Sequence, residues 1–217
     1  MSVEILVNVT PRESRAAVVL QGVVQELYLE RTNRRGLAGN IYKGRATRVL
    51  PGMQAAFIDI GLERTAFLHA ADILPPAGLD GVIEAASPEN VRELVNEGDT
   101  LLVQVVKDPI GTKGARLTTY MTLPSRFLVH MPQGRGVGVS SRIADDTERA
   151  RLREFVQEWS GGKGGWIVRT AAEGAAAEVL HADMIFLQRL WDLIREKGAG
   201  TAAGGLVHED LALPMRV

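Results

Sequence analysis

The sequence contains no cysteine in its 217 residues. This absence excludes disulfide bonds and thiolate metal sites, and it predicts a protein of the reducing cytoplasm. Histidine is also scarce, and its four positions are far apart: His69, His130, His181 and His208. None of them has the short spacing of a zinc motif, so we expect no metal site in this chain. The sequence has neither an apolar run of about 18 residues nor a signal segment, so we also expect no membrane span.

Net charge is small and aromatic residues are few, with a formal charge of −1 and 5% aromatics. The charges are nevertheless segregated along the chain. Residues 72–99 are almost entirely acidic where charged, whereas every charged side chain between positions 31 and 48 is basic: Arg31, Arg34, Arg35, Lys43, Arg45 and Arg48. Such a stripe fits either a solvated face or a nucleic-acid surface.

Residues 1–119 have the pattern of short strands. Residues 4–9, 15–20 and 23–30 are β-rich, and Gln21-Gly22 is a hairpin signal, which predicts a three-stranded antiparallel meander. Further strands are expected at 40–50, 55–60, 65–69, 101–107 and 115–119. A short helix capped by Ser87-Pro88, running to about Asn96 and ended by Gly98, is expected between them. Together they predict a small barrel.

The rest of the chain alternates helices with strands. A third unit begins at residues 126–130. We expect in it a glycine-rich loop at 132–138, a helix capped by Asp145 or Asp146 that runs to about Trp159, and a strand at 166–170. A longer helix is expected at 176–197, followed by a loose linker at 198–205. One apolar stripe along it predicts core packing: Leu180, Met184, Leu187, Trp191 and Ile194. Residues 206–217 look extended or mixed and could return to the N-terminal meander. The predicted fold class is α+β.

The barrel stretch resembles the S1 RNA-binding domain. The resemblance rests on residues 44–61, 66–69, 97–99 and 103–108. It implies an S1-type OB-fold barrel that binds single-stranded RNA, for which exposed aromatics and cations are needed. The candidate RNA-binding residues are Tyr42, Lys43, Phe57, Phe67, Lys107 and Lys113. The pattern alone also fits Phe57 and Phe67 in the core; the resemblance places both on the outside, where they stack on bases.

A wider resemblance covers essentially the whole chain. Residues 6–11, 39–44, 50–57, 105–119 and 167–174 together look like the ribonuclease E/G family, and 50–54 and 107–114 look closer to its ribonuclease G branch. The resemblance implies four parts. Residues 1–37 and 205–217 would belong to an incomplete ribonuclease-H-like subdomain, 38–123 to the inserted S1 barrel, and 124–204 to an α/β region that senses an RNA 5′-monophosphate.

The resemblance also implies which residues bind that phosphate. Arg169 and Thr170 match the family's phosphate-binding pair, the backbone at Val129 would close the pocket, and Ser125 stands near a family glycine. A guanidinium fork can donate two hydrogen bonds to a terminal phosphate, and a neighbouring hydroxyl adds one. Without the resemblance, an Arg-Thr pair at a strand end also fits a surface salt bridge beside a capping threonine.

No catalytic residue is expected in this chain. The family cleaves RNA with Mg²⁺ held by aspartates that would lie beyond these residues, and Asp145-Asp146 looks like a helix cap. We therefore expect the N-terminal RNA-binding segment of an endoribonuclease that is a homo-oligomer at full length. Its partner would be single-stranded RNA, preferably 5′-monophosphorylated. A free-standing S1-type binding module and a purely structural assembly module stay open as alternatives.

Overall fold

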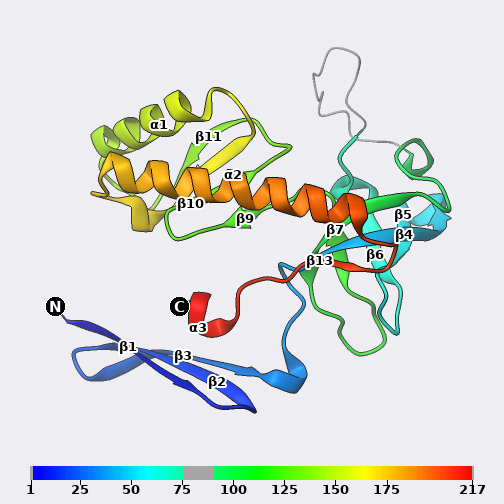
Figure 1. Cartoon of the computed structure of the whole chain (residues 1–217), viewed down its shortest axis with the longest axis horizontal. Helices are drawn as coiled ribbons and strands as arrows, with labels where there is room; N and C mark the ends of the chain where they lie inside the picture. The colour runs from blue at the N-terminus through cyan, green and yellow to red at the C-terminus, as the bar shows by residue number, and fades with distance from the viewer. Residues whose placement is uncertain (1, 76–89, 217) are drawn as a thin grey trace.

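The computed structural model describes residues 2–75 and 90–216. Within them the fold is α+β, with three β-sheets and three α-helices. Figure 1 shows a small sheet that carries the N-terminus, a barrel at the opposite side, and a helix-covered sheet joined to the barrel by the long helix α2 (Ala177–Gly200). Short 3-10 turns lie at connections: η1 (Thr32–Arg34), η2 (Pro51–Met53), η3 (Ala70–Asp72), η4 (Val91–Glu93) and η5 (Thr170–Ala172).

The N-terminal sheet is the expected antiparallel meander. It consists of β1 (Val3–Val9), β2 (Glu13–Leu20) and β3 (Val23–Arg31), in the order β1-β2-β3. Gln21 and Gly22 both have positive φ, at 50° and 78°, as a two-residue hairpin turn that follows the strand twist requires. The hairpin signal in the sequence is thereby confirmed.

The barrel is also confirmed, and it has five strands. They are β4 (Ile41–Leu50), β5 (Ala55–Asp59), β6 (Ala66–His69), β7 (Thr100–Lys107) and β8 (Arg116–Thr118). They follow the order β4-β5-β6-β8-β7, and pairing of β4 with β7 closes the barrel. β6 and β8 run parallel, whereas the other pairs are antiparallel.

Gly114 allows β6 and β8 to approach each other closely. A Cβ atom at this position would lie 2.0 Å from the carbonyl oxygen of Thr65, which is backbone and cannot swing away. We therefore expect Gly114→Ala to lower the free energy of unfolding by about 1–3 kcal/mol, the usual cost of overpacking. Urea unfolding measures this loss. A matched Gly52→Ala variant, where a Cβ meets nothing within 4 Å, should change stability much less; equal losses in the two variants would contradict the close approach.

The third unit is a four-stranded sheet covered on one face by two helices. Its order is β11-β12-β10-β9, from β9 (Leu123–Pro124), β10 (Leu128–Met131), β11 (Gly136–Val139) and β12 (Gly165–Val168). Helices α1 (Asp146–Ser160) and α2 pack against it. Asp145 caps α1 by accepting from the Thr147 N–H at 2.8 Å, as expected. The predicted α2 stripe lies in the core, with Trp191 half-buried at its margin.

Three expectations in these regions were wrong. Residues 136–138, expected in the loop at 132–138, belong to β11; the glycines that alternate with Val137 and Val139 hide the strand pattern in the sequence. The helix expected to reach Asn96 is only η4 over its described part, capped by Asn90; its Ser87-Pro88 start lies outside the described residues. Helix α2 continues to Gly200 and so takes in the first three residues of the expected linker at 198–205, because Gly198 packs against Leu102 where a Cβ would lie 2.9 Å from Leu102 Cδ2.

The C-terminal residues connect the barrel with the meander. β13 (Leu206–His208) adds to β4 beside the barrel, and α3 (Leu213–Arg216) packs against β2 and β3. The segment therefore does return to the meander, as Figure 1 shows, but it contacts that sheet as a helical turn. The pairing strand joins the barrel instead.

Candidate nucleic-acid interface

Phe57 and Phe67 are neighbours on the outer surface of the barrel. They pair directly across β5 and β6, and their ring centroids lie 6.1 Å apart at an angle of 72°. The residues on either side of each ring are buried: Ala56, Ile58, Ala66 and Leu68. Because side chains alternate along a strand, both rings point away from the barrel core and are half-buried. Two adjoining aromatic surfaces are therefore available to a ligand.

Cations flank these rings in the same row across the sheet. Arg48 pairs with Phe57, Arg116 pairs with Phe67, and Lys107 pairs with Arg116. All three cationic residues are exposed. Arg116 also forms an ion pair with Asp72 at 2.9 Å, which fixes its direction. We call Arg48, Phe57, Phe67, Arg116 and Lys107 the barrel row; it places base-stacking surfaces between groups that attract phosphates.

His69 is a further member of this surface that the sequence reasoning missed. Its ring centroid lies 6.4 Å from that of Phe67, two residues earlier on β6. Its Nδ1 accepts a hydrogen bond from the Ala71 N–H at 3.1 Å, which orients the ring. The sequence alone could have indicated His69, because residues 67 and 69 of one strand must share a face.

The other barrel candidates separate into three environments. Lys113 is exposed in the turn that follows β7, where its backbone pairs with Ile110. Lys43 is half-buried, and its Nζ donates to the carbonyl oxygen of Gly198 at 2.9 Å, which holds the C-terminal end of α2 against β4. Tyr42 corrects our expectation: only 6% of it is exposed, and it packs in the barrel core. Its ring is therefore not available for stacking on a base.

Arg169 and Thr170 lie together at the end of β12, beside the end of the parallel strand β11. Both are exposed. The Thr170 hydroxyl lies 3.0 Å from that of Ser140, which follows β11. The Arg169 N–H donates to the carbonyl oxygen of Phe127 at 2.8 Å, and its Nη1 donates to that of Ser125. The guanidinium is thus held against the turn between β9 and β10 while the side chain stays open to solvent.

Ser125 belongs to that turn, and Val129 lies in β10 directly after it. The Ser125 N–H donates to the carbonyl oxygen of Leu128 at 2.8 Å, and the Ser125 hydroxyl donates to Asp183 of α2 at 2.5 Å. Val129 is half-buried and pairs with Ile167 of β12. The structure thus brings Ser125, Arg169 and Thr170 together, with Val129 on the adjoining strand. Sequence reasoning missed Asp183 and Ser140, which contact them.

A second carboxylate holds the loop on the other side of Thr170. Glu148 of α1 accepts hydrogen bonds from Arg151 at 2.6 and 2.7 Å and from the Gly174 N–H at 2.9 Å. Arg151 also donates to the carbonyl oxygen of Ala175. The Arg151 guanidinium, followed by the Gly174 N–H, lowers the pKa of Glu148 from 4.5 to about 2.

This shift predicts a pH dependence of stability. A carboxyl whose pKa is lower in the folded state adds stability above its unfolded value, and that stability is lost as the pH falls through the folded value. The stabilising effect of Glu148 should therefore be present above pH 4.5 and disappear towards pH 2. Urea unfolding of Glu148→Gln should show a shallower loss of stability across that window than the wild type. Glu154→Gln, an exposed change on the same helix, should keep the wild-type slope; a Glu148→Gln slope equal to it would contradict the assignment.

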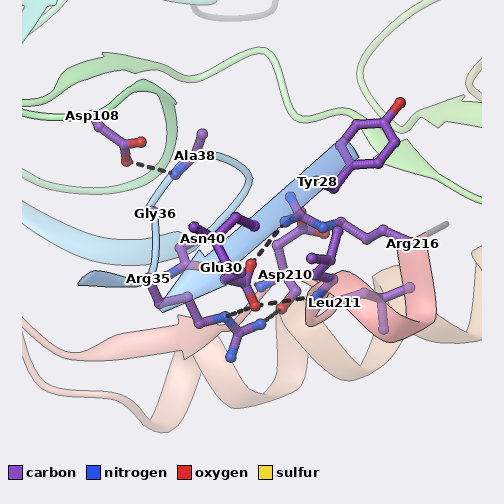
Figure 2. A pocket seen from close by; sticks show the side chains of 12 residues that line it. Tyr28, Glu30, Arg35, Gly36, Ala38, Asn40, Asp108, Asp210, Leu211 and Arg216 are labelled. Atoms are coloured by element: carbon purple, nitrogen blue, oxygen red, sulfur yellow. Dashed lines mark hydrogen bonds and ion pairs between the residues drawn. The ribbon is translucent and has the colours of Figure 1, made fainter. Parts of the chain in front are cut away.

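A pocket of about 260 Å³ lies elsewhere, between the meander, the segment after η1 and the C-terminal residues. Figure 2 shows Glu30 at its centre. Glu30 accepts from Arg216 at 2.8 Å and from the Leu213 N–H at 3.2 Å, and it lies 3.8 Å from Arg35. These ion pairs and hydrogen bonds join the meander to the C-terminal residues, and they use the charges that line the pocket. None of the predicted site residues lines it.

Residues 2–75 and 90–216 contain no group of three or more histidine, aspartate or glutamate side chains placed to hold a metal ion. Within the same residues, no helix has the length and apolar character needed to cross a membrane.

Comparison with known proteins gives a consistent set of relatives. Residues 122–217 match the model of the Ribonuclease E/G family. The whole chain is 51% identical to Ribonuclease G of Salmonella typhimurium and to Ribonuclease G of Escherichia coli K12, and it covers 45% of each. It is 40% identical to Ribonuclease E of Nostoc sp. over 90% of this chain and 27% of that protein. The chain spans less than half the length of these curated relatives.

Proposed function

The chain belongs to the ribonuclease E/G family, and on that premise we propose that it supplies the RNA-binding part of a ribonuclease G-like endoribonuclease. In this proposal the S1-type barrel binds single-stranded RNA. The Arg169 and Thr170 site receives the 5′-monophosphate of the same strand.

The barrel row supports the first half of the proposal. Single-strand binding without sequence readout combines aromatic surfaces for successive bases with cations for the backbone. Phe57 and Phe67 supply two outward rings 6.1 Å apart, and Arg48, Arg116 and Lys107 extend the same row on both sides. Every base has a π-face, so this surface suits many RNA sequences.

The fixed guanidinium of Arg169 carries the second half. Its backbone N–H and one terminal nitrogen bond to carbonyl oxygens of one turn, while the side chain is exposed. A terminal monophosphate has more charge and more free oxygens than an internal phosphodiester, and a guanidinium held in place loses less freedom on binding it. The paired hydroxyls of Thr170 and Ser140 add donors at the same strand ends.

Hydrolysis of RNA with Mg²⁺ is proposed for the whole protein and not for these residues. The described carboxylates do not gather into a set that fits Mg²⁺, so the proposal gives them no part in the cleavage. We further propose that residues 1–37 and 205–217 belong to one ribonuclease-H-like subdomain. The contact of α3 with β2 and β3 supports that grouping.

Fluorescence anisotropy of a labelled single-stranded RNA of about ten nucleotides, within the usual range for one OB fold, tests the binding proposal. We expect binding that weakens linearly with log salt concentration, no comparable binding to a duplex of the same sequence, and recovery of intact RNA. Absence of binding by folded protein would overturn the proposal. Cleavage by the purified chain would overturn the division between binding and catalysis.

A further inference from the structure

Asp183 organises the turn that faces Arg169, although it is 55 to 58 residues away in sequence from the turn residues that it binds. Asp183 lies in the first half of α2, where the neighbouring Leu180, Met184 and Leu187 are buried in the core. One carboxylate oxygen, Oδ2, accepts three hydrogen bonds: from the Ser125 hydroxyl at 2.5 Å, and from the Phe127 and Leu128 N–H groups at 3.1 Å each. A helix anchored by its core residues thus fixes the turn.

The same turn holds Arg169. The carbonyl oxygens of Ser125 and Phe127 accept from Nη1 and from the backbone N–H of Arg169, respectively. Asp183 binds the donors of this turn, and Arg169 binds its acceptors. Among the described residues, Asp183 and the Arg169 guanidinium share no direct hydrogen bond or ion pair, so the carboxylate acts on the guanidinium through the turn.

We propose that Asp183 is a positioning residue of the 5′-phosphate site, which orients Arg169 through the turn at residues 125–128. The inference rests on the proposed sensing function. The same contact gives a role to Ser125, which stands near a position where the family has glycine. Its hydroxyl donates to Asp183 and so helps to hold the turn.

The negative charge of Asp183 makes the direction of the expected change in phosphate affinity informative. A negative side chain near a phosphate site repels the ligand, so removal of the charge by itself should tighten binding. Removal of a positioning group should weaken it, because Arg169 loses its fixed direction. A decrease in affinity for the 5′-monophosphate on neutralising Asp183 therefore cannot result from charge alone.

The test measures two dissociation constants for each protein, one with 5′-monophosphate and one with 5′-hydroxyl RNA of the same sequence, at one salt concentration. In the wild type the monophosphate should bind more tightly. Asp183→Ala should lose about five-fold or more of that preference, which corresponds to about 1 kcal/mol, with unchanged affinity for the hydroxyl RNA. Ser125→Ala removes one of the three hydrogen bonds and should lose a smaller part.

Asp192→Ala, an exposed loss of the same charge on α2, is the matched control and should keep the full preference. Circular dichroism and thermal unfolding establish that each variant is folded; if Asp183→Ala is not, Ser125→Ala decides. A wild type without preference overturns the sensing function itself. A preferring wild type whose Asp183→Ala and Ser125→Ala variants keep the preference, or lose affinity for both RNAs equally, overturns the role of Asp183 alone.

Discussion

Replacing Phe57 and Phe67 together by leucine should weaken binding of single-stranded RNA at least about thirty-fold, whichever group the 5′ end carries. Loss of stacking costs about 1–3 kcal/mol per base, and two rings are removed. Leucine keeps an apolar side chain at both half-buried positions, so the barrel should remain folded. The flat surfaces on which bases stack would be lost, while the flanking cations of the barrel row would remain.

The measurement is anisotropy at fixed ionic strength, because phosphate contacts make every affinity depend on salt. Phe186→Leu is the matched control: it is 55% exposed on α2, away from the barrel row, and should bind as the wild type does. The slope of log affinity against log salt concentration should stay close to that of the wild type, because the cations that contact phosphates are unchanged. An unchanged affinity of a folded double variant would mean that RNA binds elsewhere.

Arg169→Gln should abolish the preference for a 5′-monophosphate and leave the affinity for 5′-hydroxyl RNA unchanged. Hydrogen bonds to charged groups contribute about 1.5–3 kcal/mol, so affinity for the monophosphate should fall about ten-fold or more. Arg169→Lys keeps the charge but not the planar fork, and it should retain only part of the preference. The comparison of the two variants separates the contribution of the planar guanidinium geometry from that of its positive charge.

Arg153→Gln provides the control for charge, because this exposed arginine of α1 lies outside the sensor contacts. It should change both RNA affinities equally and slightly. If Arg169→Gln behaves in the same way, the guanidinium acts as part of a diffuse positive field and not as a receptor for the terminal phosphate.

Local patterns predicted much of this fold. The meander was visible in alternating residues around Gln21-Gly22, and both of these residues adopt the left-handed conformation of a hairpin turn. The α2 stripe was visible because a period near 3.6 places Leu180, Met184 and Leu187 on one side. In both cases neighbours in sequence determine the structure.

Contacts between distant residues were not predictable in the same way. The pairing of Phe67 with Arg116 depends on the parallel register of β6 and β8, and that of Arg116 with Lys107 on the register of β8 and β7. The hydrogen bond from Ser125 to Asp183 joins residues 58 positions apart. Tyr42 illustrates the same limit: an aromatic in a barrel strand faces either the core or solvent, and the strand's register decides.

The most direct test measures the binding of the wild-type chain to two labelled RNAs of about ten nucleotides, a length that one OB fold can bind. The two RNAs have the same sequence and differ only in carrying a 5′-monophosphate or a 5′-hydroxyl. The account predicts that both RNAs bind and that the monophosphate binds about ten-fold more tightly, as expected for hydrogen bonds to a charged group. Equal dissociation constants would contradict sensing at Arg169 and leave the barrel assignment. Failure of folded protein to bind either RNA would contradict the account as a whole.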